Sequence, residues 1–251
     1  MDLIKRRPLL ITALMFWSCF SYSQQGMKPL EQLINTQEPG WPLVQEWMKN
    51  ATNKIEILSN DTAQANLALY QTQVTTRSPM GAIIYTTGGI LIDNGWLRIL
   101  GSGNPRLPRT LPGWNKGKTF GNYGEKPAFL LVADDVLGGF YAINGGELGK
   151  DLGKLYYLAP DTMEWEAMDM SYTQFLIFCF SGDLAKFYKD YRWEGWKEEV
   201  SRLKGDQAFN FYPPLFTKEG KDFAKSSRKA ISVEEQYGYT LQMQKQLQGK
   251  K

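Results

Sequence analysis

The chain has 251 residues, of which 43% are hydrophobic and 14% aromatic, so it can bury a sizeable core. Its formal net charge of +3 is small, which argues against a nucleic-acid partner and against strong attraction to acidic lipid. The sequence contains no histidine, and this excludes Ser-His-Asp triads, Cys-His pairs and zinc sites that use histidine.

The N-terminus has the pattern of a secretory signal peptide. Three basic residues at 5–7 precede an apolar run over 9–20, which is shorter than the roughly 20 residues that span a bilayer. Ser21 and Ser23 then supply the small residues of a cleavage site. We expect cleavage near Ser23, which would export the protein to the periplasm or the medium without a stable membrane anchor. The alternative is a buried N-terminal helix.

Export would leave Cys179 as the one remaining thiol, because Cys19 lies in the leader. A single thiol cannot form an intramolecular disulfide. Cys179 lies in an apolar run at 175–180, so we expect a buried side chain and not a nucleophile.

The first third of the mature chain predicts short helices. Apolar faces recur at 30–34 and 41–47, and residues 54–58 form a short β-like run. Asp61 can cap a helix that extends to about residue 73.

The centre of the chain predicts an antiparallel meander. Asn94 and Gly95 favour a tight hairpin turn between two apolar runs, because both residues tolerate a positive φ. The expected strands number about six: 89–92, 96–100, 129–133, 140–143, 154–158 and 163–167.

The last third predicts helices. Ser171 with Gln174 and Ser232 with Glu235 form two capping boxes, and Asp183 begins a further amphipathic pattern. Helices from both chain ends around an antiparallel or mixed sheet define the α+β class.

The chain divides into a leader (1–23), a single α+β domain (24–212) and a helical, basic C-terminal extension (213–251). From residue 218 onward, eight Lys or Arg stand against four Asp or Glu. This extension is either a solvated tail or an arm that touches another surface of the cell envelope.

Residues 101–126 form the segment that folding explains least. Loops of this length without regular structure are often functional. We hypothesise that it binds a protein partner through five side chains: Arg106, Arg109, Trp114, Lys116 and Lys118. The alternative is a solvated loop that folds across the sheet with Trp114 as its anchor.

No cofactor or metal site is expected. Residues 113–119 resemble a phosphate-binding loop, but three residues instead of four separate Gly113 from Gly117. No strand leads into this segment, and the predicted sheet is not parallel.

Four acidic residues support a competing hypothesis, a hydrolase that acts on cell-envelope sugar or peptide. Asp134 and Asp135 are neighbours that point to opposite faces, and we favour turn formation for them. Glu164 and Glu166 share a face of one strand, which also fits a half-buried strand.

Five strings carry a family resemblance: LRILGSGNPRLPR (97–109), GWNKGK (113–118), FLLVADDVLGGFYAINGG (129–146), YYLAPDTMEWE (156–166) and FCFSGDLAKFY (178–188). They resemble a bacterial domain-of-unknown-function family, the one numbered 2625, over about residues 27–235. That resemblance implies no activity. The layout of the hairpin at 138–141 and the helix capped by Ser171 is also similar to the SUKH superfamily, many of whose members resemble immunity proteins that bind and neutralise contact-dependent toxins. The export signal departs from that pattern if most relatives are cytoplasmic.

Together these features favour an exported, non-enzymatic binding module that recognises a protein partner.

Overall fold

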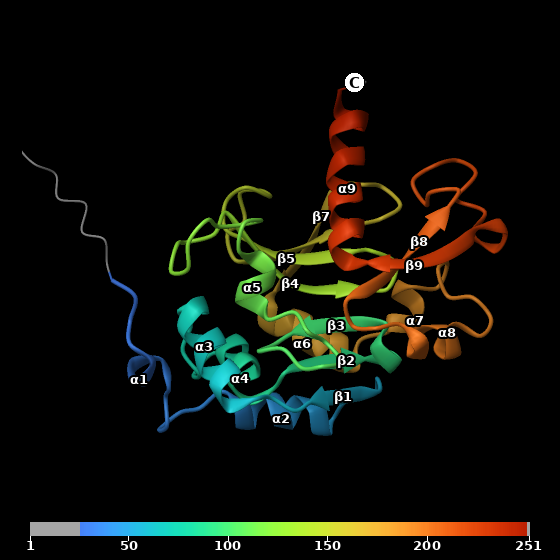
Figure 1. Cartoon of the computed structure of the whole chain (residues 1–251). Coiled ribbons are helices and arrows are strands. Elements are labelled where there is room, and N and C mark those ends of the chain that lie inside the picture. The colour runs from blue at the N-terminus through green and yellow to red at the C-terminus, as the bar shows by residue number, and fades with distance from the viewer. Residues whose placement is uncertain (1–25, 250–251) are drawn as a thin grey trace, which may run out of the picture.

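The computed structural model describes residues 26–249. Within that range, seven strands form one antiparallel sheet in the order β1 to β7, and β8 and β9 form a separate two-stranded sheet (Figure 1). The α+β class is confirmed, and the expected sheet of about six strands is corrected to seven. The strands are β1 (Ile55–Leu58), β2 (Gly89–Ile92), β3 (Leu97–Leu100), β4 (Phe129–Asp135), β5 (Phe140–Asn144), β6 (Lys154–Leu158), β7 (Trp165–Ser171), β8 (Gln207–Tyr212) and β9 (Ser227–Ser232).

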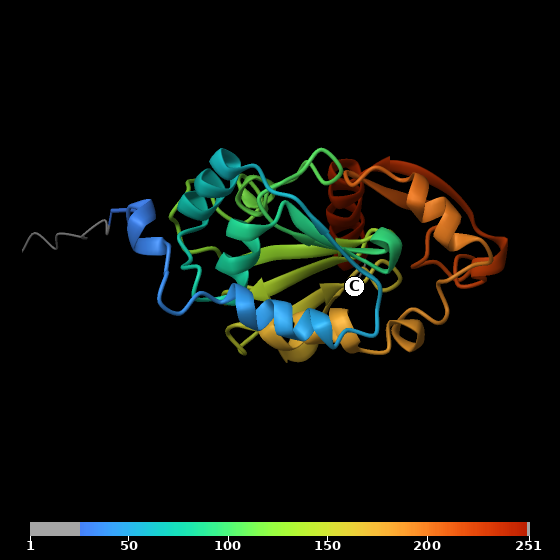
Figure 2. The ribbon, with the colours of Figure 1, turned by 90° about the horizontal axis from the view of Figure 1, so that it is seen from below.

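Helices enter before, between and after these strands. They are α1 (Leu30–Leu33), α2 (Trp41–Lys49), α3 (Thr62–Thr72), α4 (Pro79–Thr86), α5 (Leu111–Asn115), α6 (Tyr172–Ser181), α7 (Leu184–Phe187), α8 (Trp196–Arg202) and α9 (Val233–Gln248), with short 3-10 turns η1 (Asp93–Gly95) and η2 (Phe223–Lys225). In Figure 2, α1 and the β8–β9 hairpin lie at opposite ends of the molecule.

The additional strand is β1 at one edge of the sheet. Ile55 lies opposite Ile92 and Leu58 lies opposite Gly89, so β1 pairs antiparallel with β2. The connection between the two strands contains α3 and α4. Since this pairing joins segments about 30 residues apart, the β-like run at 54–58 did not by itself place β1 in the sheet.

Side-chain caps begin the predicted helices. The Asp61 carboxylate accepts from the Gln64 backbone amide at 2.9 Å, and Ser232 accepts from the Glu235 amide at 3.0 Å. Ser171 forms a complete capping box at α6. The apolar spacing that begins at Asp183 predicts a longer helix than the structure contains. Helix α7 ends at Phe187.

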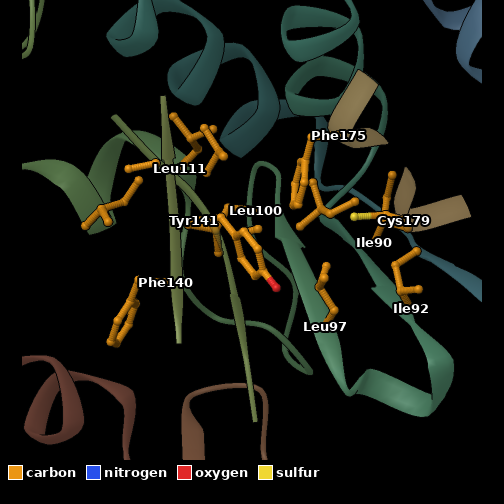
Figure 3. Packing of buried hydrophobic residues seen from close by; sticks show 14 of the residues in the cluster. Ile90, Ile92, Leu97, Leu100, Leu111, Phe140, Tyr141, Phe175 and Cys179 are labelled. Carbon is orange, nitrogen blue, oxygen red and sulfur yellow. The ribbon is translucent and has the colours of Figure 1, made fainter. Parts of the chain in front are cut away.

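The sheet is covered on both faces, and neighbouring residues of β5 show which helices cover each one. Phe140 packs against Trp114 and Tyr237, with ring centroids at 6.3 and 4.9 Å, so α5 and α9 cover its face. Tyr141 packs against Phe175 of α6 at 4.9 Å on the other face. Figure 3 shows Phe140 and Tyr141 pointing to opposite sides of β5. We name these the α9 face and the α6 face.

The segment at 213–251, expected to be helical, also contains the strand β9. The two prolines at 213–214 lie in the connection between β8 and β9, and β9 pairs with β8 from Gln207↔Ser232 to Tyr212↔Ser227. Val233 and Tyr237 are buried at the start of α9. The C-terminal part of the chain therefore packs on the sheet through these residues.

Residues 101–126 contain local structure. Helix α5 lies within this segment, and Asn104 and Leu107 exchange two backbone hydrogen bonds. Leu107 and Leu111 are fully buried. Leu107 and Leu111 therefore anchor the segment in the hydrophobic core.

Between residues 26 and 249 no helix combines the length and apolar character needed to cross a bilayer. The predicted leader, with its cleavage point near Ser23, lies outside the described residues.

Candidate functional site

A buried charge cluster lies on the α9 face. Arg98 of β3 is directly opposite Asp134 of β4, so both side chains project from the same face. The Arg98 Nε lies 2.5 Å from one carboxylate oxygen of Asp134, and Arg109 donates to the other oxygen. The side chains of Arg98 and Asp134 are 2% and 1% exposed. One carboxylate therefore neutralises part of the charge of two buried guanidinium groups.

The same two arginines hold the chain between α8 and β8. Arg98 donates to the carbonyl oxygen of Gln207, and Arg109 donates to that of Gly205 at 2.9 Å. A β-carbon at Gly205 would clash with the Arg106 carbonyl oxygen. Residues 205–207 therefore pack closely against residues 106–109, and only glycine at position 205 allows this close approach.

A groove of about 650 Å³ opens beside this cluster, and we call it the polar groove. The sheet residues Glu56, Leu91 and Arg98 form its floor, and they lie in one cross-strand row. One wall is formed by residues 105–108 and the other by residues 200–206. The buried arginines join the two walls.

The predicted loop residues occupy different environments. Arg106 lines the polar groove and forms a two-pronged pair with Glu56, and this pair is exposed. Lys116 is exposed and lies over the Tyr123 ring at 4.6 Å. The structure therefore does not gather the five candidate side chains on one surface.

Trp114 is buried, with 5% of its surface exposed. This burial fits the alternative in which Trp114 anchors the loop. The Arg109 guanidinium lies 4.8 Å and the Lys118 ammonium 4.3 Å from the centre of its ring. Lys118 also pairs with Glu234 of α9 at 2.8 Å. Three of the five candidate residues therefore fix the loop to the sheet and to α9.

Asp135 lies on the α6 face at the end of β4. One of its carboxylate oxygens accepts from the backbone amides of Leu137 and Gly139, at 3.0 and 2.9 Å. The other oxygen accepts from the hydroxyl groups of Tyr157 and Tyr188, at 2.8 and 3.0 Å. This carboxylate both forms the turn and fixes two tyrosine rings.

Burial dominates the titration of this group. It raises the pKa of Asp135, against the lowering effect of the hydrogen bonds from Tyr157, Gly139 and Tyr188. Burial and the nearby Asp135 charge also raise the pKa of both tyrosines well above the ordinary value.

The four candidate acids do not form one carboxylate pair. Asp134 and Asp135 face opposite sides of the sheet. Glu164 precedes β7 and is exposed, whereas Glu166 lies opposite Tyr157 in the β6–β7 ladder. Glu166 is therefore on the α6 face beside Tyr157, whose hydroxyl donates to Asp135.

A second cavity, of about 390 Å³, lies where β6 and β7 meet α6 and α7, and we call it the aromatic pocket. Its floor includes the buried Tyr157 and Tyr188, and its half-exposed rim includes Phe178, Phe187, Met168 and Tyr191.

In the described part of the chain, no three Cys, Asp or Glu side chains cluster so that they could hold a metal ion. Cys179 is fully buried, and burial raises the pKa of its thiol well above the ordinary value. These features suit a packing role for the thiol.

The family described as "Protein of unknown function DUF2625" matches residues 30–236. The chain belongs to this family. It is 46% identical over 217 residues to the "Putative uncharacterized protein YbfG" of Escherichia coli K12, covering 86% of this chain and 97% of that protein. An "Uncharacterized protein" of Haemophilus influenzae Rd is 43% identical over 211 residues, covering 84% and 92%. No solved structure matches the chain.

Reasoning from sequence missed the aromatic pocket as a site. Met168 and Met170 of β7 line this pocket, but the predicted strand ended at residue 167. Strand alternation alone would not have placed both side chains, because Asp169 between them has a positive φ of 54° and the β6–β7 register shifts in this stretch. Tyr157 and Tyr188 are 31 residues apart, and their shared contact with Asp135 arises only from the fold.

Proposed function

We propose that this protein is a binding module that recognises an acidic segment of a protein partner in the polar groove. The observation that carries this proposal is the connection between the two groove walls. Arg98 of β3 and Arg109 of the 101–126 segment hold the 205–207 backbone in place through partly buried hydrogen bonds. A groove fixed in this way loses little conformational freedom on binding, which favours affinity.

The charge of the lining supports an acidic partner. Four cationic residues and two acidic residues line the groove. Arg98 and Arg106 already have carboxylate partners, so the further positive charge comes from Lys54 and Lys204, which outnumber the remaining acidic residue Asp206. Apolar side chains of Leu91, Val200 and Leu203 lie between these charges. Mixed apolar and cationic walls suit a segment that carries both apolar and acidic side chains.

Two further parts of the proposal concern location and partner class. The N-terminal pattern favours action in the periplasm or outside the cell, after cleavage near Ser23. Mass spectrometry of the protein from the cell envelope should then find Gln24 as the first residue, and an intact N-terminus would contradict export by cleavage there. The similarity of layout to the SUKH superfamily favours an immunity-like role, which requires one dominant protein partner.

Site-specific photo-crosslinking tests the proposed groove. A photoreactive residue is placed at Lys204 in the groove wall, and at Lys49 on α2 as the control, which lies outside the groove. Cells that carry the natural partner should give one dominant protein adduct from position 204 and not from position 49.

Charge reversal supplies the second arm. Arg106→Glu should reduce the adduct from position 204 at least fivefold, whereas Lys116→Glu should not, because Lys116 does not line the groove. Equal adducts from positions 204 and 49, or equal yields with both charge reversals, would contradict recognition in this groove.

A further inference from the structure

The aromatic pocket lies on the α6 face, away from the polar groove, and its lining combines rings with acidic groups. Phe187 contacts Phe178, Tyr188 and Tyr157, with ring centroids at 5.5, 4.7 and 5.9 Å. Phe187 is nevertheless 38% exposed. These rings therefore form a continuous wall that is partly open to solvent.

The opposite wall comes from β7. Glu166 lies opposite Tyr157, and Glu166, Met168 and Met170 all line the pocket. Methionine side chains adapt to irregular apolar ligands. The pocket thus has an aromatic wall, a thioether wall and a carboxylate at the same strand.

Asp161 and Glu166 are the charged residues among those that line this cavity, and both are acidic. The Tyr191 hydroxyl donates to Asp161 at 2.7 Å, and the Thr162 hydroxyl donates to Glu166 at 2.8 Å. Each bond engages one oxygen of its carboxylate. A carboxylate has about four lone-pair sites, so both groups retain capacity to accept from a ligand.

Acidic groups surround the Tyr191 hydroxyl at the rim of the pocket. Burial raises the pKa of Tyr191, and the hydrogen bond to Asp161 and the charges of Asp161, Asp190 and Glu166 raise it further. The rim of the pocket is therefore negative, whereas its wall is apolar. An anion would be repelled there, and a neutral apolar ligand would leave the carboxylates without a charged partner.

We propose that the aromatic pocket binds a small organic cation, an alkylammonium whose charge lies between Asp161 and Glu166 and whose apolar part lies against Phe187 and the two methionines. Aromatic faces attract cations, and carboxylates accept hydrogen bonds from an ammonium group. The volume of about 390 Å³ is in the range of small-molecule sites.

Calorimetric titration with three probes of equal chain length tests the ligand class: n-hexylammonium, n-hexanol and n-hexanoate. We expect n-hexylammonium to bind at least tenfold more tightly than n-hexanol, and n-hexanoate to bind more weakly than both. Equal affinity for the ammonium and the alcohol, or tighter binding of the carboxylate, would overturn the proposal.

Variants locate the site. Glu166→Gln and Asp161→Asn should each weaken n-hexylammonium binding at least fivefold and leave n-hexanol binding unchanged. Glu194→Gln makes the same change in charge outside the pocket and should have no effect. Loss of affinity in all three variants, or in none of them, would refute this placement of the charge.

A third readout reports contact directly. The methyl NMR signals of Met168 and Met170 should shift on addition of n-hexylammonium, whereas that of Met48, on α2, should not. Urea unfolding shows whether each variant is folded. If a variant does not fold, the methyl-shift measurement on the wild-type protein tests the site in its place. Unmoved signals of Met168 and Met170 at saturating ligand would overturn the proposal.

Discussion

Removal of the Asp134 charge should lower the free energy of unfolding far more than removal of an exposed charge. Asp134→Asn leaves Arg98 and Arg109, whose side chains are 2% and 10% exposed, without their anionic partner. Breaking a buried pair by removing one partner costs about 3–5 kcal/mol, because a charge stays buried without compensation. A typical domain has a free energy of unfolding of about 5–15 kcal/mol, so the variant should lose a large fraction of its stability.

Glu56→Gln provides the matched control. It also removes a carboxylate bound to an arginine, but here the side chains of Arg106 and Glu56 are 58% and 47% exposed. Exposed pairs contribute about 0–1 kcal/mol, because water and salt screen them. Both substitutions change one carboxylate to its amide, so burial is the main difference between them.

Urea unfolding followed by tryptophan fluorescence measures both variants. With a slope of about 2 kcal/mol per molar urea, Asp134→Asn should lower the midpoint by about 1.5–2.5 M, and Glu56→Gln by less than about 0.5 M. Similar small shifts for the two variants would refute the interpretation that Asp134 compensates two buried arginines.

Three other predictions follow from buried groups. Trp114→Ala should lower the free energy of unfolding by about 3–5 kcal/mol in urea titration, and Lys116→Ala by less than about 0.5 kcal/mol, because Trp114 is buried and Lys116 is exposed; equal effects would contradict the anchor role. The Cys179 thiol should resist a water-soluble disulfide reagent until urea unfolds the protein, and rapid labelling of the native protein, located by mass spectrometry, would contradict its burial. Because burial raises the pKa of Asp135 in the folded state, the native protein binds more protons than the unfolded chain above the usual aspartate pKa of about 4, so stability from this group falls as pH rises. Asp135→Asn removes that dependence, so wild-type stability relative to the variant should decline from about pH 4 towards pH 7 in parallel urea titrations, and a rise would show that the pKa is lowered.

Local patterns predicted the elements whose causes are local. Asn94 has a positive φ of 62° in the turn between β2 and β3, as the tight turn at Asn94 and Gly95 requires. The caps at Asp61 and Ser232 depend on bonds within three residues, so sequence shows them directly. The single thiol lies in an apolar run, and its burial follows from that run.

Pairings between distant segments escaped prediction. The β-like run at 54–58 joins the sheet through β2, and β8 and β9 pair across a 14-residue connection. The positive charges of the loop predicted a surface free to bind a partner. Arg109 instead pairs with Asp134 of β4, 25 residues further along the chain, and its side chain is largely buried. A charge visible in sequence is therefore a poor guide to a free charge in the fold.

The candidate acids show the same limit. Opposite faces for Asp134 and Asp135 followed from strand geometry, and the structure confirms this. The partners of each carboxylate did not follow, because Arg98, Arg109, Tyr157 and Tyr188 reach them through tertiary packing.

Hydrogen–deuterium exchange on the complex with the crosslinked partner tests the binding proposal most directly. Recognition in the polar groove predicts slower exchange in three segments, 54–56, 104–108 and 200–206, with residues 116–126 and 218–232 unchanged. Protection of residues 116–126 or 218–232, with the three groove segments unchanged, would show that the partner binds elsewhere on the molecule.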